Sequence, residues 1–314
     1  MKRFSNILFV SESDVDDARA LARAATLADN NQAQLTLIAT VDTGSSILGQ
    51  RIRDSLVAER EERLQELAGS VSRSVGPPET KVLAGRAFIE IIREVQRNER
   101  DLVVKSSGRT NPHLPGSVDQ KLLRKCPCPV WIINSAEEKG YRQILLALDF
   151  EPENPENEPL NRQLVEMAAS LALSEFAQLH VVHAWKLEHE SFFRSARSGL
   201  SREEVDQMIV DEEDARRRWL EKFVADCCRS LGTEASGYLK PEFHLIRGYA
   251  EEVVPRCASD LGAELVVMGT VGRTGIPGFV IGNTADAILN RIDCSVLAVK
   301  PAGFVSPVAV DNSG

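Results

Sequence analysis

Continuous apolar runs alternate with segments of helical periodicity along this chain. In the second half the apolar runs occupy 143–149, 178–185, 242–247, 264–269 and 295–300. Helical periodicity occupies 159–173, 201–231, 249–260 and 283–291. Runs without polar alternation are typical of strands covered on both faces. The alternation therefore predicts an α/β fold, with a parallel sheet and helices on both of its faces.

Four sequence blocks occur twice in the same order, which predicts a duplicated domain. The pairs are NILFVSE (6–12) with QILLALD (143–149), LAGRAFIEIIREV (83–95) with IRGYAEEVVPRCA (246–258), DLVVKSSGRT (101–110) with ELVVMGTVGRT (264–274), and CPVWII (128–133) with CSVLAV (294–299). We expect a first domain at 1–139, a second at 140–302 and a C-terminal tail at 303–314. The second half carries an insertion within 186–216, which we interpret as a loop that leads into a long helix.

Composition excludes several classes of protein. The 314 residues have 43% hydrophobic and 26% charged side chains, as ordinary globular domains do. A net charge of −9 and 5% aromatic residues disfavour nucleic-acid binding. No apolar run approaches the length of a transmembrane segment or a signal peptide, so we expect a cytoplasmic protein. The six cysteines form no CxxC pair, and we expect them to be buried thiols.

The stretch MGTVGRTGIPGFVIGNTADAIL (268–289) is the strongest candidate for a ligand site. Gly269, Gly272 and Gly282 follow a strand, and Asn283 and Thr284 begin a helix. Glycine allows close approach to the backbone, and a helix N-terminus favours anions, so a phosphate group is the natural ligand. The spacing G-x2-G-x9-G matches neither the dinucleotide-binding fingerprint nor the Walker A loop.

These features resemble the universal stress protein family. The glycine spacing, Asp149 at the end of the first strand of the second half, and the final strand SVLAVKP (295–301) carry the resemblance, and LLRKCPCPVW (122–131) with the duplication points to the tandem, two-domain type. The resemblance implies two domains, each a five-stranded parallel sheet of strand order 3-2-1-4-5 with helices on both faces. It also implies that the two halves pair within the chain, so we expect a monomer or a weak homodimer.

The resemblance also implies a nucleotide site, with ATP or a related nucleotide and Mg²⁺ as its cofactors. In nucleotide-binding members of the family the first-strand Asp contacts the nucleoside, second-strand backbone holds the adenine, and the glycine loop holds the phosphates. The corresponding residues here are Asp149, Ala184 with the neighbouring His183, Gly269, Gly272, Arg273, Gly282, Asn283 and Thr284. Asn283 stands where the family has Ser or Thr, and the acidic segment 151–158 disfavours a triphosphate unless a cation compensates.

The first half departs from this pattern. Ser106 replaces the first glycine, Glu12 stands in the place of Asp149, and seven residues separate Gly108 from Gly116 where nine separate Gly272 from Gly282. We therefore expect a degenerate site in the first half and one phosphate-bearing ligand per chain, bound by the second half.

Metal binding and catalysis have weaker support. His180 and His183 lie three apart in a predicted strand, which sends their side chains to opposite faces. With His189, Cys227 and Cys228 they leave a zinc site as an open alternative, and we assign no metal ligand. The sequence contains no HExxH or GxSxG motif.

We therefore expect a stress-response protein that acts by binding, with protein partners that the sequence does not identify. Two alternatives stay open. One is a weak ATP hydrolase, and the other is a scaffold that binds partner proteins or an apolar ligand between its domains without nucleotide.

Overall fold

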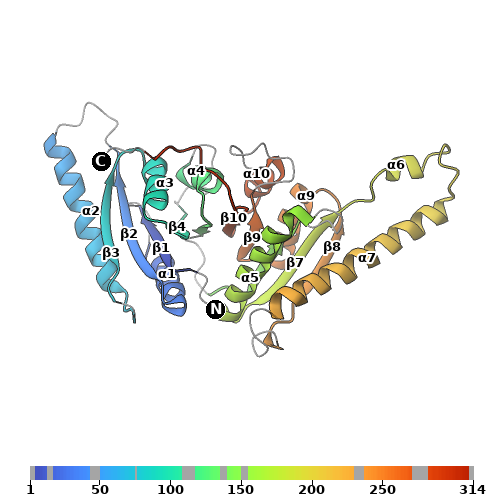
Figure 1. The fold of residues 1–314 in the computed structure, drawn as a ribbon, viewed down its shortest axis with the longest axis horizontal. Coiled ribbons are helices and arrows are strands. Elements are labelled where there is room, and N and C mark those ends of the chain that lie inside the picture. Colours follow the sequence, from blue (N-terminus) through green and yellow to red (C-terminus); the bar gives the residue numbers. More distant parts are fainter. Residues whose placement is uncertain are drawn as a thin grey trace. The chain divides into compact units, whose positions relative to one another are not determined.

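The structure is a computed structural model that describes residues 4–12, 17–42, 50–74, 76–107, 117–134, 140–149, 155–229, 237–270 and 282–310. By their contacts the residues form two compact units. The first unit consists of residues 1–140 together with 270–314, and the second consists of residues 141–269. Each unit is a sheet with helices packed on it (Figure 1).

The sheet of the first unit has the strand order β3-β2-β1-β4-β5-β10. The strands are β1 (Asn6–Ser11), β2 (Gln34–Val41), β3 (Glu79–Ala84), β4 (Leu102–Ser106), β5 (Val130–Ile133) and β10 (Ser295–Val299). The first five are parallel, whereas β10 runs antiparallel to β5, with Val296 opposite Ile132. The helices are α1 (Ala18–Asn31), α2 (Gln50–Ser70), α3 (Ala87–Arg97), α4 (Val118–Lys125) and α10 (Asn283–Leu289).

The second unit has four parallel strands in the order β9-β6-β7-β8. They are β6 (Gln143–Ala147), β7 (Gln178–Trp185), β8 (Glu242–Arg247) and β9 (Leu265–Gly269). The α-helices are α5 (Glu158–Glu175), α6 (Glu190–Phe193), α7 (Arg202–Arg229) and α9 (Ala250–Leu261), and a 3-10 turn, η1 (Pro155–Asn157), precedes α5.

The expected fold class is confirmed. The first repeat has the strand order 3-2-1-4-5, and the four strands of the second unit repeat the order 3-2-1-4. The central strands are buried throughout, which explains their unbroken apolar runs; Ile7, Leu8 and Phe9 of β1, for example, have no exposed surface.

Two glycines show that the repeat extends to backbone geometry. Gly85 and Gly248 follow the third strand of each repeat and have φ of +142° and +153°. Each donates its N–H to the end of the second strand, Gly85 to Val41 O at 2.9 Å and Gly248 to Trp185 O at 3.0 Å. A Cβ atom would lie 2.8 Å from a side-chain carbon of the following helix at either position. Only glycine fits this turn without strain.

The insertion in the second repeat forms α6 and the first turns of α7, which confirms the predicted loop and long helix. Its anchor is a small apolar cluster of Trp185, Val205 and Ile209, against which Leu187 and Phe193 pack. None of the helices in the described ranges is long and apolar enough to cross a membrane.

Candidate functional site

The carboxyl ends of β6, β7 and β9 bring three of the expected site residues to one edge of the second unit. Ala147, at the end of β6, lies opposite Val182 of β7 on one side and Met268 of β9 on the other. Asp149 and Ala184 follow two residues after Ala147 and Val182, and Gly269 directly follows Met268. Because β7 and β9 lie on opposite sides of β6, the chain connections diverge at this point, and such switch points are where open α/β sheets bind ligands.

Asp149 is exposed at this edge, and the backbone beneath it is held in place. Asn161 of α5, only 2% exposed, donates from Nδ2 to the carbonyl oxygen of Asp149 at 3.0 Å. His183 donates from Nδ1 to Leu148 O at 3.1 Å. Sequence reasoning missed Asn161, because a lone Asn inside a helix does not indicate which strand end it reaches.

Gly269 has a packing role in the structure. A Cβ atom at this position would lie 3.1 Å from Leu160 Cδ2 and 3.7 Å from Leu164 Cδ1, both on α5. The glycine thus lets α5 pack closely against β9. This requirement holds whether or not a phosphate approaches the same backbone.

Gly282, Asn283 and Thr284 begin α10 in the first unit. Gly282 precedes the helix with φ −61° and ψ 142°, which any residue can adopt, and its N–H donates to Thr270 O at 2.9 Å. The side chains of Asn283 and Thr284 are exposed, and no side chain caps the helix. Gly272 and Arg273 lie outside the described residues.

The corresponding edge of the first unit carries a cluster of charged side chains. Lys105 of β4 is 1% exposed, and its Nζ lies 2.7 Å from Asp119 Oδ1 on α4 and 3.1 Å from Glu12 Oε2 after β1. The same Nζ donates to Ser106 O at 2.9 Å. Burial lowers the pKa of Lys105, but the two carboxylates outweigh it, so the pKa is raised overall.

A second buried carboxylate extends this network. Ser11 Oγ donates to Asp17 Oδ2 at 2.6 Å, and Arg63 NH2 lies 3.8 Å from the same oxygen. Burial raises the pKa of Asp17, against the opposing effects of Ser11 and Arg63. Helix α4, which carries Asp119, is capped by the residue that precedes it, because Ser117 Oγ accepts from the N–H of Gln120 at 3.1 Å. Internal charges therefore gather at the carboxyl edge of the first sheet, among the residues that the structure describes.

The histidines of the second unit do not form the group that their sequence spacing offered. His183 faces Leu148 O and Arg216, whereas His180 lies beside His244 and Glu242 of the neighbouring strand β8. Glu242 and His244 are two residues apart in β8, so their side chains lie on the same face of the sheet. Sequence reasoning missed both residues because the pairing of β7 with β8 decides which side chains meet.

None of the six cysteines forms a disulfide; five are buried and Cys294 is partly buried, as expected of mostly buried thiols. Cys126 and Cys128 lie with their sulfur atoms 3.6 Å apart. Burial raises the pKa values of Cys227 and Cys257 to about 11, so both are inert thiols near neutral pH.

The family model for the universal stress protein family matches residues 3–134 and again residues 140–300. The chain belongs to the universal stress protein family. The two matches cover nearly its whole length and correspond to the two sequence repeats.

Universal stress proteins that match nearly the whole of this chain are among its relatives. Universal stress protein E of Escherichia coli K12 is 27% identical over 99% of both chains, and the homologue from Haemophilus influenzae is 26% identical over 96% of this chain and 98% of its own. A crystal structure of a universal stress protein from Pseudomonas aeruginosa UCBPP-PA14 has 25% identity and a TM-score of 0.65, with 96% of this chain and 94% of that chain covered. These likenesses confirm the tandem family architecture.

Proposed function

We propose that this stress-response family member binds one adenine nucleotide, ATP or a close relative, in its second repeat, and that it acts by binding. The observation that carries the proposal is the exposed Asp149 at the switch strand β6, between the ends of β7 and β9. The equivalent position of the first unit holds Glu12 in an ion pair with buried Lys105.

The residues at this edge suit the parts of a nucleotide. Asp149 accepts hydrogen bonds from ribose hydroxyls, and the backbone at Ala184, one residue before the end of β7, contacts the base. Phosphate oxygens accept from backbone N–H groups between Gly269 and the start of α10, with Gly272 and Arg273 in that segment and Gly282, Asn283 and Thr284 at its end. Thr284 adds a hydroxyl donor.

If the ligand is a triphosphate, the proposal includes a divalent cation bound with it. The segment 151–158 carries four glutamates, Glu151, Glu153, Glu156 and Glu158, and it follows Asp149 within two residues. Mg²⁺ binds phosphate oxygens and carboxylates, so it offsets the repulsion between this segment and the ligand. We expect ATP to bind more tightly with Mg²⁺ than without it, and AMP to depend on Mg²⁺ less.

Isothermal titration calorimetry of the full chain with ATP, ADP and AMP tests the proposal. We expect one site per chain, and no turnover approaching 1 per second, the low end of the usual enzyme range. Two equivalent sites would contradict the assignment to the second repeat. Turnover of that order that disappears in Asp149→Ala would make the protein an ATP hydrolase, and absence of any nucleotide binding would favour the scaffold.

We also propose that the protein is cytoplasmic and that partner proteins distinguish its ligand-bound form from its ligand-free form. The pairing of β5 with β10 within the chain uses the edges of both last strands, which favours a monomer or a weak homodimer. Light scattering that gives a stable tetramer would contradict this part.

A further inference from the structure

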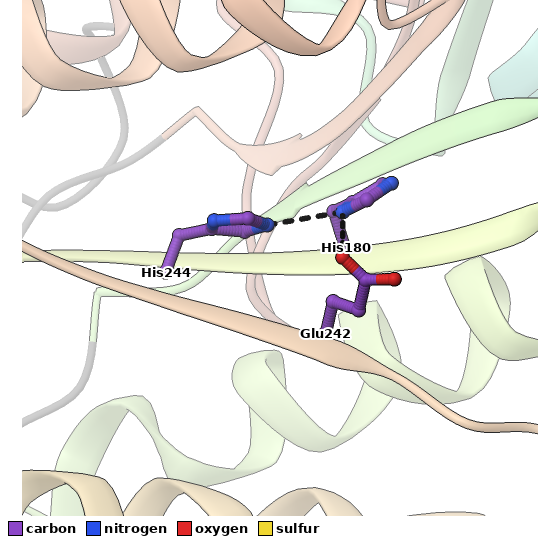
Figure 2. Close-up of side chains that lie close together, drawn as sticks. All are labelled: His180, Glu242 and His244. Atoms are coloured by element: carbon purple, nitrogen blue, oxygen red, sulfur yellow. Dashed lines mark hydrogen bonds and ion pairs between the residues drawn. The ribbon is translucent and has the colours of Figure 1, made fainter.

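Three side chains with metal-ligating atoms converge on the outer part of the second unit. They are His180 of β7 and Glu242 and His244 of β8, and Figure 2 shows the His244 ring and the Glu242 carboxylate both directed at the His180 ring. Among the residues that the structure describes, this is the one group of three or more His, Cys, Asp or Glu side chains arranged to hold a metal ion. The cluster lies near the amino ends of β7 and β8, whereas Asp149 lies beyond the carboxyl end of β6.

The hydrogen bond to Gln143 fixes the state of His180. His180 Nε2 lies 2.7 Å from Gln143 Oε1, a carbonyl oxygen that carries no hydrogen, so Nε2 holds the ring proton and donates it. In the neutral ring Nδ1 then carries no proton and presents a lone pair. Metal-ligating histidines typically donate their second ring N–H to such an oxygen, which orients the ring.

The lone pair on His180 Nδ1 faces the two other ligand atoms. His244 Nε2 lies 3.0 Å from it and Glu242 Oε2 lies 3.6 Å from it. A carboxylate oxygen directed at a nitrogen lone pair is repulsive unless a cation lies between them.

The distances suit zinc. With zinc–nitrogen bonds of about 2.0–2.1 Å, two ligands of a tetrahedral site lie roughly 3.3 Å apart. The two separations from His180 Nδ1 fall on either side of that value, and all three ligand atoms lie within 4.8 Å of one another. The Glu242 side chain is 61% exposed, so it can rotate to complete the site and leaves a path for the ion from solvent.

We infer that His180, Glu242 and His244 bind a divalent transition-metal ion of the zinc class, with the fourth position open to water. Two imidazoles and one carboxylate form a recognised zinc ligand set. The same set disfavours Mg²⁺, which prefers oxygen ligands. Bound zinc would join the outer strand β8 to β7. The site does not depend on the nucleotide proposal, since it shares no residue with it.

Titration of the EDTA-treated full chain with Zn²⁺, in competition with a chromophoric chelator, tests the inference. We expect one zinc ion per chain. His244→Gln and Glu242→Gln each remove a ligand and should weaken zinc binding by more than about 10-fold, and Gln143→Leu should weaken it by about 10- to 100-fold while every ligand remains. His189→Gln, an exposed histidine of the same unit outside the cluster, is the matched control and should bind as the wild type does.

Co²⁺ provides the second measurement. Nitrogen and oxygen ligation gives visible d–d bands without the intense near-ultraviolet band of a thiolate ligand. Such a thiolate band would overturn the inference. Substoichiometric zinc, or affinity in His244→Gln and Glu242→Gln equal to that of His189→Gln, would also overturn it and leave the three residues as a hydrogen-bonded cluster. Circular dichroism checks that each variant is folded.

Discussion

The two repeats share the same strand order, but the carboxyl edges of their sheets carry different side chains. In the first repeat Lys105 and Asp119 form a buried ion pair with Glu12 beside it. The counterparts of Lys105 and Asp119 in the second repeat are Met268 and Ala285, both buried and uncharged. The duplicated sheet thus supplies a switch point twice, with a buried ion pair at these two positions in the first repeat and apolar side chains in the second. The difference supports one ligand per chain.

The largest effect should come from replacing Gly282 in the second repeat. Gly282→Val should abolish nucleotide binding, because a branched side chain at the start of α10 obstructs the approach of phosphate to the backbone N–H groups. The backbone at Gly282 has an ordinary negative φ, so the expected cause is steric obstruction and not strain. Calorimetry with ATP measures the effect.

Gly116→Val, the matched change in the first repeat, is the control and should leave nucleotide binding largely intact. Circular dichroism verifies folding of both variants. Equal loss of binding in the two would show that the repeats are not functionally different.

The ion pair of the first repeat should account for the next largest effect. Asp119→Ala leaves the buried Lys105 with Glu12 as its remaining carboxylate partner, and we expect a loss of about 3 to 5 kcal/mol in the free energy of unfolding. Urea denaturation of the full chain measures it.

The double variant Lys105→Met/Asp119→Ala reproduces the residues of the second repeat and should recover much of that loss, since an apolar pair needs no charge compensation. A double variant as unstable as Asp119→Ala would show that packing, and not the unpaired charge, causes the loss.

A buried lysine also distinguishes the ends of the last strands. Lys300 follows β10, is 4% exposed and donates from Nζ to Leu123 O at 2.7 Å, whereas its counterpart after β5 is Asn134. Burial lowers the pKa of Lys300 to about 8, despite the opposing effect of Cys126 and Cys128. Lys300→Met should therefore raise the free energy of unfolding at pH 7, by up to about 3 kcal/mol.

The gain from Lys300→Met should depend on pH. Between pH 8 and the ordinary lysine pKa of 10.5, the folded protein binds fewer protons at this site than the unfolded chain, so wild-type stability rises with pH. The advantage of Lys300→Met should be full below pH 8 and shrink above it, as measured by urea denaturation of both proteins from pH 7 to 10. An advantage that does not change with pH would contradict the lowered pKa.

The smallest effect concerns the hydroxyl of the second-repeat helix. Thr284→Ala should weaken nucleotide binding by about 1.5 to 3 kcal/mol, the contribution of a hydrogen bond to a charged acceptor. Calorimetry against Thr284→Ser, which keeps the hydroxyl, isolates that contribution. Equal weakening in Thr284→Ser would assign the effect to the methyl group instead.

The strands could be predicted from the sequence because buried parallel strands appear as unbroken apolar runs, whereas their order was implied by the resemblance to the universal stress protein family. The runs predicted at 178–185 and 242–247 coincide with β7 and β8, and the predicted helix 249–260 differs from α9 by one residue at each end. The last strands of the two repeats lie side by side, as the family pairing predicts.

The side-chain clusters could not be predicted in the same way. His180 meets a histidine 64 residues later, and Lys105 meets carboxylates on two other elements. Such contacts depend on strand register and helix placement, which periodicity does not specify. In the sequence Lys105 was one charge at the end of an apolar run, with no sign that it is buried.

The antiparallel pairing of β10 with β5 has a consequence for synthesis of the protein. Translation delivers β5 by residue 133 and its partner β10 only from residue 295, so the ribosome adds about 160 residues in between. At roughly 5–20 residues per second this takes about 10 to 30 s. During that interval the nascent chain presents the apolar strand Val130–Ile133 with an open edge, the kind of edge that recruits other strands. The second unit, residues 141–269, is fully synthesised before that edge is covered.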